Sequence, residues 1–198
     1  KAYLFDELRP TPELSFAVRH LHASAGVVVT ASHNPKEYNG YKVYGEDGGQ
    51  LPLESSNAVL EEINKYDDVN ITKVKVISRQ EAIDKGLLQI IGKDIDDEYI
   101  KYLKTISINS ELTKQTGRDF KIVYTPLHGS GNKLVRRILD ETGFKNVLVV
   151  PEQEKPDPEF STVKTPNPEE KSAFSLAIAL AQKEDVNLII GTDPDCDR

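Results

Sequence analysis

Residues 188–198 read L-I-I-G-T-D-P-D-C-D-R, a short apolar run followed directly by a polar loop. An uninterrupted apolar run of this length predicts a buried strand. Two similar strands are expected earlier, at 121–124 and 147–150, and a helical pattern separates each pair of neighbours. Alternating strands and helices predict a parallel sheet with right-handed crossovers. We therefore assign residues 113–198 to an α/β domain.

The two helices of this domain carry recognisable end signals. The first, at 132–141, has one apolar face, and Gly143 follows its end. We expect Asn167 to cap the second, with a proline and a glutamate at favoured positions of the first turn. Because the carboxyl ends of parallel strands meet at one edge, loops 125–129 and 192–198 should lie on the same rim, where ligands bind.

Residues 1–112 are assigned to a first domain. The expected elements are a helix at 11–21, a strand at 27–30, a hairpin pairing 41–44 with 50–53, and helices within 54–115. Thr11 is expected to cap the first helix, and Ser78 stands three residues before Glu81, as in a capping box. The fold class is therefore α/β, with mixed or parallel sheets flanked by helices in two domains, of which the first is truncated.

Composition excludes several classes of function. The chain has 198 residues and a net charge of −7, so a large basic surface for nucleic acid is not expected. No apolar run approaches the length of a membrane span. The single cysteine, Cys196, fits a reducing cytoplasm and is expected to be a packing residue. The chain begins with Lys1 and contains no methionine, so we expect it to be part of a longer protein.

The polar segment T-A-S-H-N-P at 30–35 follows the apolar run 26–29. A serine at the carboxyl end of a buried strand has its hydroxyl near a ligand crevice. A serine hydroxyl becomes a good nucleophile only with a base, a metal ion or a charged setting. His33 and Lys42 are the nearby candidates for catalysis beside Ser32. A simple Ser-Asn-Pro turn is the alternative.

Asp193, Asp195 and Asp197 alternate along the last loop. Carboxylate oxygens are hard ligands that suit Mg²⁺. A calcium EF-hand loop is excluded, because Arg198 stands where that loop needs glycine and a strand precedes the loop. The remaining alternative is a solvated acidic turn, in which three like charges repel one another.

Two further residues are candidates for phosphate binding. Arg198 could pair with the carboxylates or bind phosphate through two hydrogen bonds, and its position in the sequence fits both roles. His128 ends a strand and precedes Gly129, Ser130 and Gly131, where a phosphate could approach the helix that follows. A tight structural turn is favoured there, with His128 lining the cleft.

Four motifs in order give the chain a family resemblance. T-A-S-H-N-P at 30–35, followed by N-G-Y-K at 39–42, resembles the phosphoserine loop of the α-D-phosphohexomutases, which include phosphoglucomutases, phosphomannomutases and phosphopentomutases. D-P-D-C-D-R at 193–198 resembles their magnesium loop, with Pro194 where the usual form has glycine. T-P-L-H-G at 125–129 and T-P-N-P-E at 165–169 are similar to further family segments.

The resemblance implies an intramolecular phosphotransferase that interconverts a sugar 1-phosphate and a 6-phosphate or 5-phosphate. Phosphorylated Ser32 would give its phosphoryl group to the sugar, and a sugar bisphosphate would reorient and return the other phosphate. Mg²⁺ would be held by Ser32, Asp193, Asp195 and Asp197. Lys42 is the candidate for proton transfer. The sugar itself stays open among glucose, mannose and pentose phosphates.

The resemblance also implies partners within the same chain. The opening half of the first domain, with its active-site arginine, would precede residue 1, and sugar-reading and phosphate-clamping domains would follow residue 198. The fragment alone is then expected to be inactive. Two alternatives stay open: a non-catalytic sugar-phosphate-binding paralogue, and a metal-dependent phosphatase in which water replaces the sugar hydroxyl.

Overall fold

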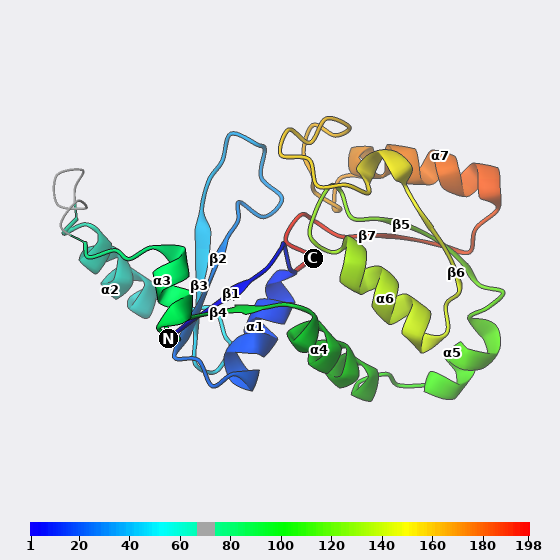
Figure 1. Ribbon diagram of the computed structural model, residues 1–198. Helices are drawn as coiled ribbons and strands as arrows, with labels where there is room; N and C mark the ends of the chain where they lie inside the picture. The colour runs from blue at the N-terminus through cyan, green and yellow to red at the C-terminus, as the bar shows by residue number, and fades with distance from the viewer. Residues whose placement is uncertain (67–73) are drawn as a thin grey trace.

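The computed structural model describes residues 1–66 and 74–198. Two α/β halves lie side by side, and the C-terminal loop ends between them (Figure 1). The first half contains β1 (Ala2–Phe5), α1 (Thr11–His20), β2 (Ala25–Val29), β3 (Tyr41–Gly45), α2 (Leu53–Ile63), α3 (Arg79–Asp84) and β4 (Leu88–Ile91). The second contains α5 (Ser110–Thr116), β5 (Lys121–Thr125), α6 (Asn132–Thr142), β6 (Asn146–Val149), α7 (Ser175–Glu184) and β7 (Leu188–Gly191). Helix α4 (Lys93–Thr105) connects them.

The second half has the expected parallel sheet. Its strands are ordered β6-β5-β7, and β5 pairs with both neighbours in parallel. Helix α7 covers one face and α6 the other (Figure 1). The core on the α7 side is built from Val123, Val150 and Ala177, with Phe174 and Ile189 packed against them. Apolar runs long enough to be buried on both faces explain why these strands could be recognised from the sequence.

The first half consists of two small sheets. Strands β1 and β4 pair in parallel, from Ala2 with Leu88 to Phe5 with Ile91, and neither strand was expected from the sequence. Strands β2 and β3 pair antiparallel, with Val27 opposite Val43. The core here gathers Ala17, Ile91 and Ile95 between α1, β4 and α4. The α/β class is therefore confirmed, with small parallel and antiparallel sheets among the described residues.

The expected hairpin between 41–44 and 50–53 forms only in part. Strand β3 pairs mainly with β2, and the returning segment adds an antiparallel bridge between Tyr44 and Gln50 and a hydrogen bond of 2.9 Å from the amide of Leu51 to the carbonyl oxygen of Val43. The amide of Gly45 donates to the carbonyl oxygen of Gly49 at 2.9 Å, which closes a tight turn. Pro52 then begins α2 as its N-cap residue. A proline has no amide hydrogen to continue a ladder, so the second strand of the hairpin stops there.

Two of the expected helix caps were also wrong. Thr11 is the first residue of α1, after Pro10, and its side chain does not cap the helix. The side chain of Asn167 accepts a hydrogen bond from the amide of Glu169 at 3.0 Å, which makes a local turn, and α7 begins only at Ser175. Asparagine side chains stabilise such turns as readily as helix starts. The Ser78 cap is confirmed, because its side chain accepts from the amide of Glu81.

Helix α4 packs against α1 of the first half and α6 of the second half, and so sets the distance between the two halves. Its buried residues Ile95 and Ile100 face the core. On the side of the first half, Arg9 binds Asp96 through two hydrogen bonds of 2.6 and 3.1 Å. On the side of the second half, Lys104 binds Glu141 at 2.7 Å. Among the described helices, none has the length and apolar character that a membrane crossing requires.

Candidate active site at the junction of the two halves

Three loops meet where the two halves face each other. They follow β2, β5 and β7, at residues 30–40, 126–131 and 192–198. The last two are bonded directly, because the amide and the hydroxyl of Ser130 both donate to the carbonyl oxygen of Pro194, at 2.8 and 2.9 Å. Gly129 permits this approach, since a Cβ atom there would lie 2.4 Å from the Cα atom of Pro194. The two loops therefore share one rim, as the parallel topology predicts.

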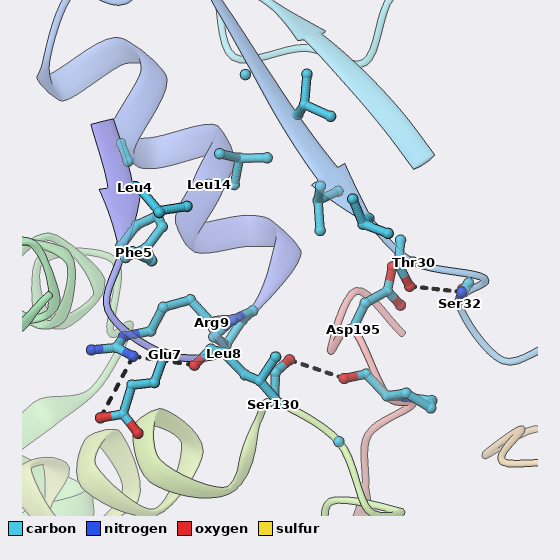
Figure 2. Close-up of a pocket in the computed structure, with 18 of the residues that line it drawn as sticks. Leu4, Phe5, Glu7, Leu8, Arg9, Leu14, Thr30, Ser32, Ser130 and Asp195 are labelled. Atoms are coloured by element: carbon cyan, nitrogen blue, oxygen red, sulfur yellow. Dashed lines mark hydrogen bonds and ion pairs between the residues drawn. The ribbon is translucent and has the colours of Figure 1, made fainter. Parts of the chain in front are cut away.

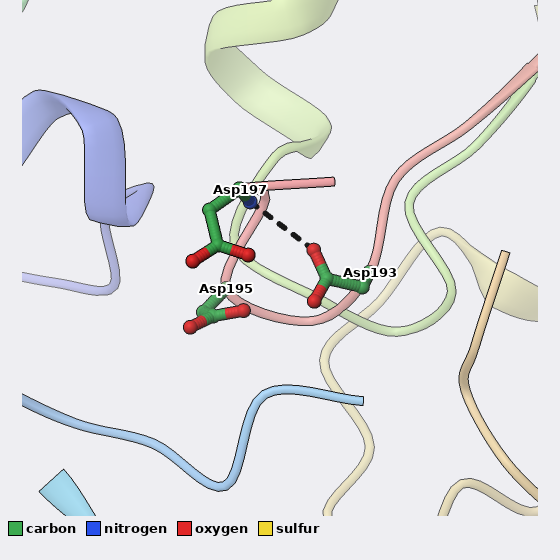
Figure 3. A group of neighbouring side chains, drawn as sticks. All are labelled: Asp193, Asp195 and Asp197. Carbon is green, nitrogen blue, oxygen red and sulfur yellow. Dashed lines mark hydrogen bonds between the residues drawn. The ribbon is translucent and has the colours of Figure 1, made fainter. Parts of the chain in front are cut away.

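The three aspartates form one cluster. One carboxylate oxygen from each of Asp193, Asp195 and Asp197 lies within 4.8 Å of the other two. Figure 3 shows the three carboxylates turned toward a common centre. The loop is tied by Asp193, whose Oδ1 accepts from the amides of Asp197 at 3.1 Å and Arg198 at 3.2 Å. Cys196 takes a left-handed conformation, with φ at 58°, and so lets the chain turn within the cluster.

Ser32 reaches this cluster from the first half. Its hydroxyl donates to Oδ2 of Asp193 at 3.0 Å, across 161 positions of sequence. Nδ1 of His33 lies 3.3 Å from the same hydroxyl oxygen. The amide of Ser32 donates to Oγ1 of Thr30 at 2.8 Å. Figure 2 shows this hydrogen bond next to Asp195. The backbone φ of Ser32 is 53°, a conformation that costs a non-glycine residue energy and is common at functional sites.

Lys42 supplies the positive charge of the cluster. Its Nζ atom lies 2.8 Å from Oδ2 of Asp195 and 2.6 Å from Oδ2 of Asp197. Burial acts to lower the pKa of Lys42, but the hydrogen bonds to the two carboxylates outweigh burial and raise that pKa. The ammonium ion therefore persists at neutral pH and balances part of the negative charge.

The carboxyl groups of Asp193 and Asp195 differ in the direction of their pKa shifts. Burial and the adjacent Asp195 raise the pKa of Asp193 to about 6, against the opposing hydrogen bond from Ser32. Burial also acts to raise the pKa of Asp195, but the Lys42 hydrogen bond and the contact with Asp193 leave it lowered. The pair therefore resists carrying two full charges unless a further cation is present.

The donor set fits a divalent cation. Oδ1 of Asp195 is buried and has no hydrogen-bond partner among the described residues. A buried carboxylate oxygen without a partner is costly and would be satisfied by a metal ion. The donors around it are oxygens, which suits Mg²⁺. Burial raises the pKa of the Cys196 thiol to about 11, so this sulfur stays protonated at neutral pH as long as no metal ion is bound.

An open groove of about 1200 Å³ begins at this cluster. Ser32, Ser130 and Asp195 line its polar end, and apolar residues such as Leu4 and Leu14 line the rest (Figure 2). The polar end offers the Ser32 hydroxyl and the Asp195 carboxylate, and these two residues are bonded to Asp193 and to the ammonium group of Lys42. This combination is suited to transfer of a phosphoryl group assisted by a divalent cation.

Two family models match the chain. The model described as phosphoglucomutase/phosphomannomutase, alpha/beta/alpha domain II, matches residues 97–198, and the one described as domain I matches residues 1–70. The chain belongs to the phosphoglucomutase/phosphomannomutase family. The resemblance found in the four sequence motifs is thereby confirmed. The domain boundary between residues 112 and 113 stays a prediction.

Relatives of the family are similar over the whole chain. It is 45% identical to a phosphoglucomutase of Staphylococcus haemolyticus and 42% identical to one of Staphylococcus saprophyticus, with 100% of the chain covered in both cases. These alignments cover 35% and 34% of the relatives, so the chain spans about a third of their length.

Solved structures of the family agree in fold. A putative phosphomannomutase from Thermus thermophilus matches 100% of the chain and 40% of its own, with a TM-score of 0.79 and 26% identity. A phosphoglucomutase/phosphomannomutase family protein from Burkholderia thailandensis matches 94% of the chain and 37% of its own, with a TM-score of 0.60. At 20% identity the second likeness concerns the fold alone.

Two predicted residues of this mutase-family chain lie at the edge of the cluster. Arg198 has Nη1 3.2 Å from Glu169 and Nε 3.7 Å from Oδ2 of Asp193. His128 is engaged at both ring nitrogens, by the carbonyl oxygen of Lys155 at 3.1 Å and by Oγ1 of Thr162 at 2.8 Å. In this arrangement its ring holds the loop that follows β6. Their roles in phosphate binding stay predictions.

Thr11 was missed as a residue of the site. Its hydroxyl donates to Oδ2 of Asp195 at 3.2 Å, and its amide donates to the carbonyl oxygen of the same residue at 2.8 Å. In the sequence, Thr11 and the proline that follows it indicated only the start of a helix. A threonine between two prolines gives no sign of a partner 184 positions away.

Proposed function

We propose that this chain supplies the phosphoserine loop and the metal loop of a phosphosugar mutase, an intramolecular phosphotransferase. One observation carries the proposal: the Ser32 hydroxyl of one half lies 3.0 Å from Asp193 in the carboxylate cluster of the other. A nucleophilic hydroxyl beside a divalent-cation site is the arrangement that phosphoryl transfer needs. Membership of the family supports the same reaction class.

Charge explains why a metal ion belongs to this proposal. A phosphate on Ser32 would add about two negative charges beside three carboxylates. Asp193, Asp195, Asp197 and the oxygen of Ser32 would hold Mg²⁺. When bound, the ion would neutralise charge on the transferring phosphoryl group. Lys42 alone cannot balance this charge, since it already pairs with Asp195 and Asp197.

The transfer step exchanges one bond to phosphorus for another. The bond between phosphorus and Oγ of Ser32 breaks as a sugar hydroxyl oxygen bonds to phosphorus, and the hydroxyl proton leaves. The reverse step on the other phosphate regenerates phosphorylated Ser32 and releases the isomerised sugar phosphate. Lys42 stays the proposed group for transfer of this proton. Oγ of Ser32 must gain a proton as it leaves phosphorus, and His33, with Nδ1 3.3 Å from that oxygen, is the neighbour that we propose to supply it.

Sugar phosphates are the proposed substrates. The two relatives described above are named phosphoglucomutase. Glucose phosphates are therefore the first to test, followed by mannose and pentose phosphates. We propose that residues 1–198 alone do not isomerise a sugar phosphate, because they span only about a third of the length of the relatives.

The test is Ser32→Ala in the full-length protein, assayed with a panel of sugar 1-phosphates. Loss of the nucleophile should lower turnover by about a thousandfold or more with unchanged melting. Ser56→Ala is the matched control, because Ser56 is an exposed serine on α2 that only bonds a nearby carbonyl. Mass spectrometry should find a phosphate on Ser32 of the wild type.

The other outcomes separate the alternatives. Near-normal mutase activity of Ser32→Ala would rule out the phosphoserine mechanism. Release of inorganic phosphate without isomerised sugar would favour the metal-dependent phosphatase. Binding of a sugar phosphate by a wild type that carries no phosphate and gives no turnover would favour the non-catalytic paralogue.

A further inference from the structure

Thr11 joins the first half of the molecule to the metal loop of the second. It is the first residue of α1 and is 2% exposed. Its amide donates to the carbonyl oxygen of Asp195 at 2.8 Å, and its hydroxyl donates to Oδ2 of the same residue at 3.2 Å. One threonine therefore binds both the backbone and the side chain of one carboxylate residue.

These contacts give the two oxygens of the Asp195 carboxylate different surroundings. Oδ2 accepts hydrogen bonds from Thr11 and from Nζ of Lys42, the latter at 2.8 Å. Oδ1 is buried and has no partner among the residues that the structure describes. Two donors on Oδ2 fix the rotation of the carboxylate, so Oδ1 is the oxygen of Asp195 left without a protein donor in the cluster formed with Asp193 and Asp197.

Thr11 is itself held in place. Pro10 and Pro12 flank it and restrict the backbone on both sides. The residue before this segment, Arg9, is anchored to Asp96 on α4 by two hydrogen bonds of 2.6 and 3.1 Å. The hydroxyl of Thr11 is therefore presented from a rigid segment, and little conformational entropy is lost when it binds Asp195.

We propose that Thr11 is a positioning residue that orients Asp195 for metal binding. It touches neither substrate nor metal and acts only through the carboxylate. This inference rests on the proposed function, because it requires the aspartate cluster to hold Mg²⁺. It adds that the affinity of the loop at 192–198 for Mg²⁺ depends on α1, a helix of the other half.

The experiment measures Mg²⁺ binding directly in the full-length protein, by calorimetric titration. Thr11→Val removes the hydroxyl with little change in shape and should raise the dissociation constant for Mg²⁺ about tenfold, the effect of losing one hydrogen bond to a charged group. Thr11→Ser keeps the hydroxyl and should stay within about twofold. Thr142→Val is the matched control, since the Thr142 hydroxyl bonds only helix carbonyls of α6.

Kinetics give a second readout. At saturating Mg²⁺ the Thr11→Val variant should regain most of its kcat, and the KM for the sugar phosphate should stay near that of the wild type. A uniform loss of kcat that Mg²⁺ does not relieve would overturn the positioning role. If Thr11→Val does not fold, Thr11→Ser and Thr11→Ala replace it, because they differ in the hydroxyl alone.

The result that overturns the inference is a Thr11→Val, or Thr11→Ala, protein that binds Mg²⁺ as tightly as the wild type. That result leaves the proposed function intact if Ser32→Ala is inactive. A wild type that isomerises sugar phosphates but binds no Mg²⁺ overturns the inference and the metal part of the proposal together. A wild type that binds Mg²⁺ without mutase activity, with weaker binding in Thr11→Val, supports the inference and contradicts the proposed function.

Discussion

The two halves end their strands in the same kind of loop but support those loops differently. In the second half, Val123 and Tyr124 of the central strand β5 are 0% exposed, between a parallel neighbour on each side and a helix on each face. In the first half, Val27 and Val29 of β2 are 58% and 78% exposed. Within residues 1–198, one half carries its loops on a three-stranded sheet with a buried central strand, and the other on a two-stranded ribbon whose apolar face is uncovered.

The difference indicates which half orders the site. Two-stranded ribbons are marginally stable by themselves. The loop after β2 and the start of β3 are held in addition by contacts with the second half, through Ser32 to Asp193 and through Lys42 to Asp195. The loop after β7 continues a sheet whose central strand is buried, and it needs less support of this kind. We infer that the geometry of Ser32 depends on the second half more than the reverse.

Removal of the metal should have the largest effect, because the ion would join the two halves. Chelation with EDTA should lower the mutase activity of the full-length protein by about a thousandfold or more, since a divalent cation contributes several kcal/mol to phosphoryl transfer. Added Mg²⁺ should restore it. The measurement is turnover before and after chelation, with melting followed in parallel. Unchanged turnover in EDTA would remove the ion from the mechanism.

A pair of valine substitutions compares the two sheets. Val123→Ala leaves a cavity in a fully buried site and should lower the free energy of unfolding by about 2 kcal/mol. Val29→Ala at an exposed site should change it by less than about 0.5 kcal/mol in residues 1–198. Urea denaturation measures both. If the same Val29→Ala change is much more costly in the full-length protein, another segment covers this face there. Equal costs for the two variants in residues 1–198 would remove the contrast between the halves.

A buried carboxyl group makes the first half sensitive to pH. Glu13 of α1 is fully buried, and burial, followed by the neighbouring Asp96, raises its pKa to about 9. The folded pKa lies above the usual value, so stability is greatest in acid and falls as the pH rises from about 4.5 through 9. Glu13→Gln mimics the protonated form and should remove this loss.

The stability that Glu13→Gln gains over the wild type should grow as the pH rises. At pH 9, Glu13→Gln should be more stable than the wild type by about 1 to 3 kcal/mol, and at pH 4 the two should be similar. Urea denaturation across this pH range is the measurement. Glu61→Gln, at an exposed position of α2, is the control and should show no such trend. A constant difference between Glu13→Gln and the wild type from pH 4 to 9 would contradict the raised pKa.

Helix caps should give the smallest effect and show no contrast between the halves. The side chain of Ser78 caps α3, and that of Asn109 caps α5, each by accepting a backbone amide. Ser78→Ala and Asn109→Ala should each cost about 1 kcal/mol, because capping is a local interaction. Thermal melting of both variants checks this. A much larger loss for either cap would mean that its helix supports more than its own first turn.

Sequence patterns located the second half well. Its strands were recognisable because burial on both faces requires continuous apolar runs, and Gly143 takes the left-handed conformation expected after α6. The pairing of β1 with β4 could not be foreseen, since a short strand carries little pattern and its partner is far away in the sequence. The hairpin was predicted correctly at its turn and first pairs, but the pairing of β3 with β2 was not foreseen, because turn residues do not reveal which other strand a segment pairs with.

The site was predictable in its chemistry and less so in its details. Ser32 and the aspartates stood out because serine and carboxylates followed apolar strands. The pairing of Lys42 with Asp195 and Asp197, and the engagement of both nitrogens of His128, depend on side-chain geometry that no local pattern carries. The left-handed conformation of Ser32 has no signal in its residue type either.

The length of α4 has a consequence for how this chain can vary. Arg9 holds Asp96 near its start, and Arg137 of α6 holds Asp97 at 2.7 Å. One inserted residue would turn the rest of the helix by about 100° and advance it by about 1.5 Å. The 3.0 Å contact between Ser32 and Asp193 would not survive such a displacement. Insertions and deletions among natural variants should therefore spare α4 and accumulate in exposed turns such as that at 85–87.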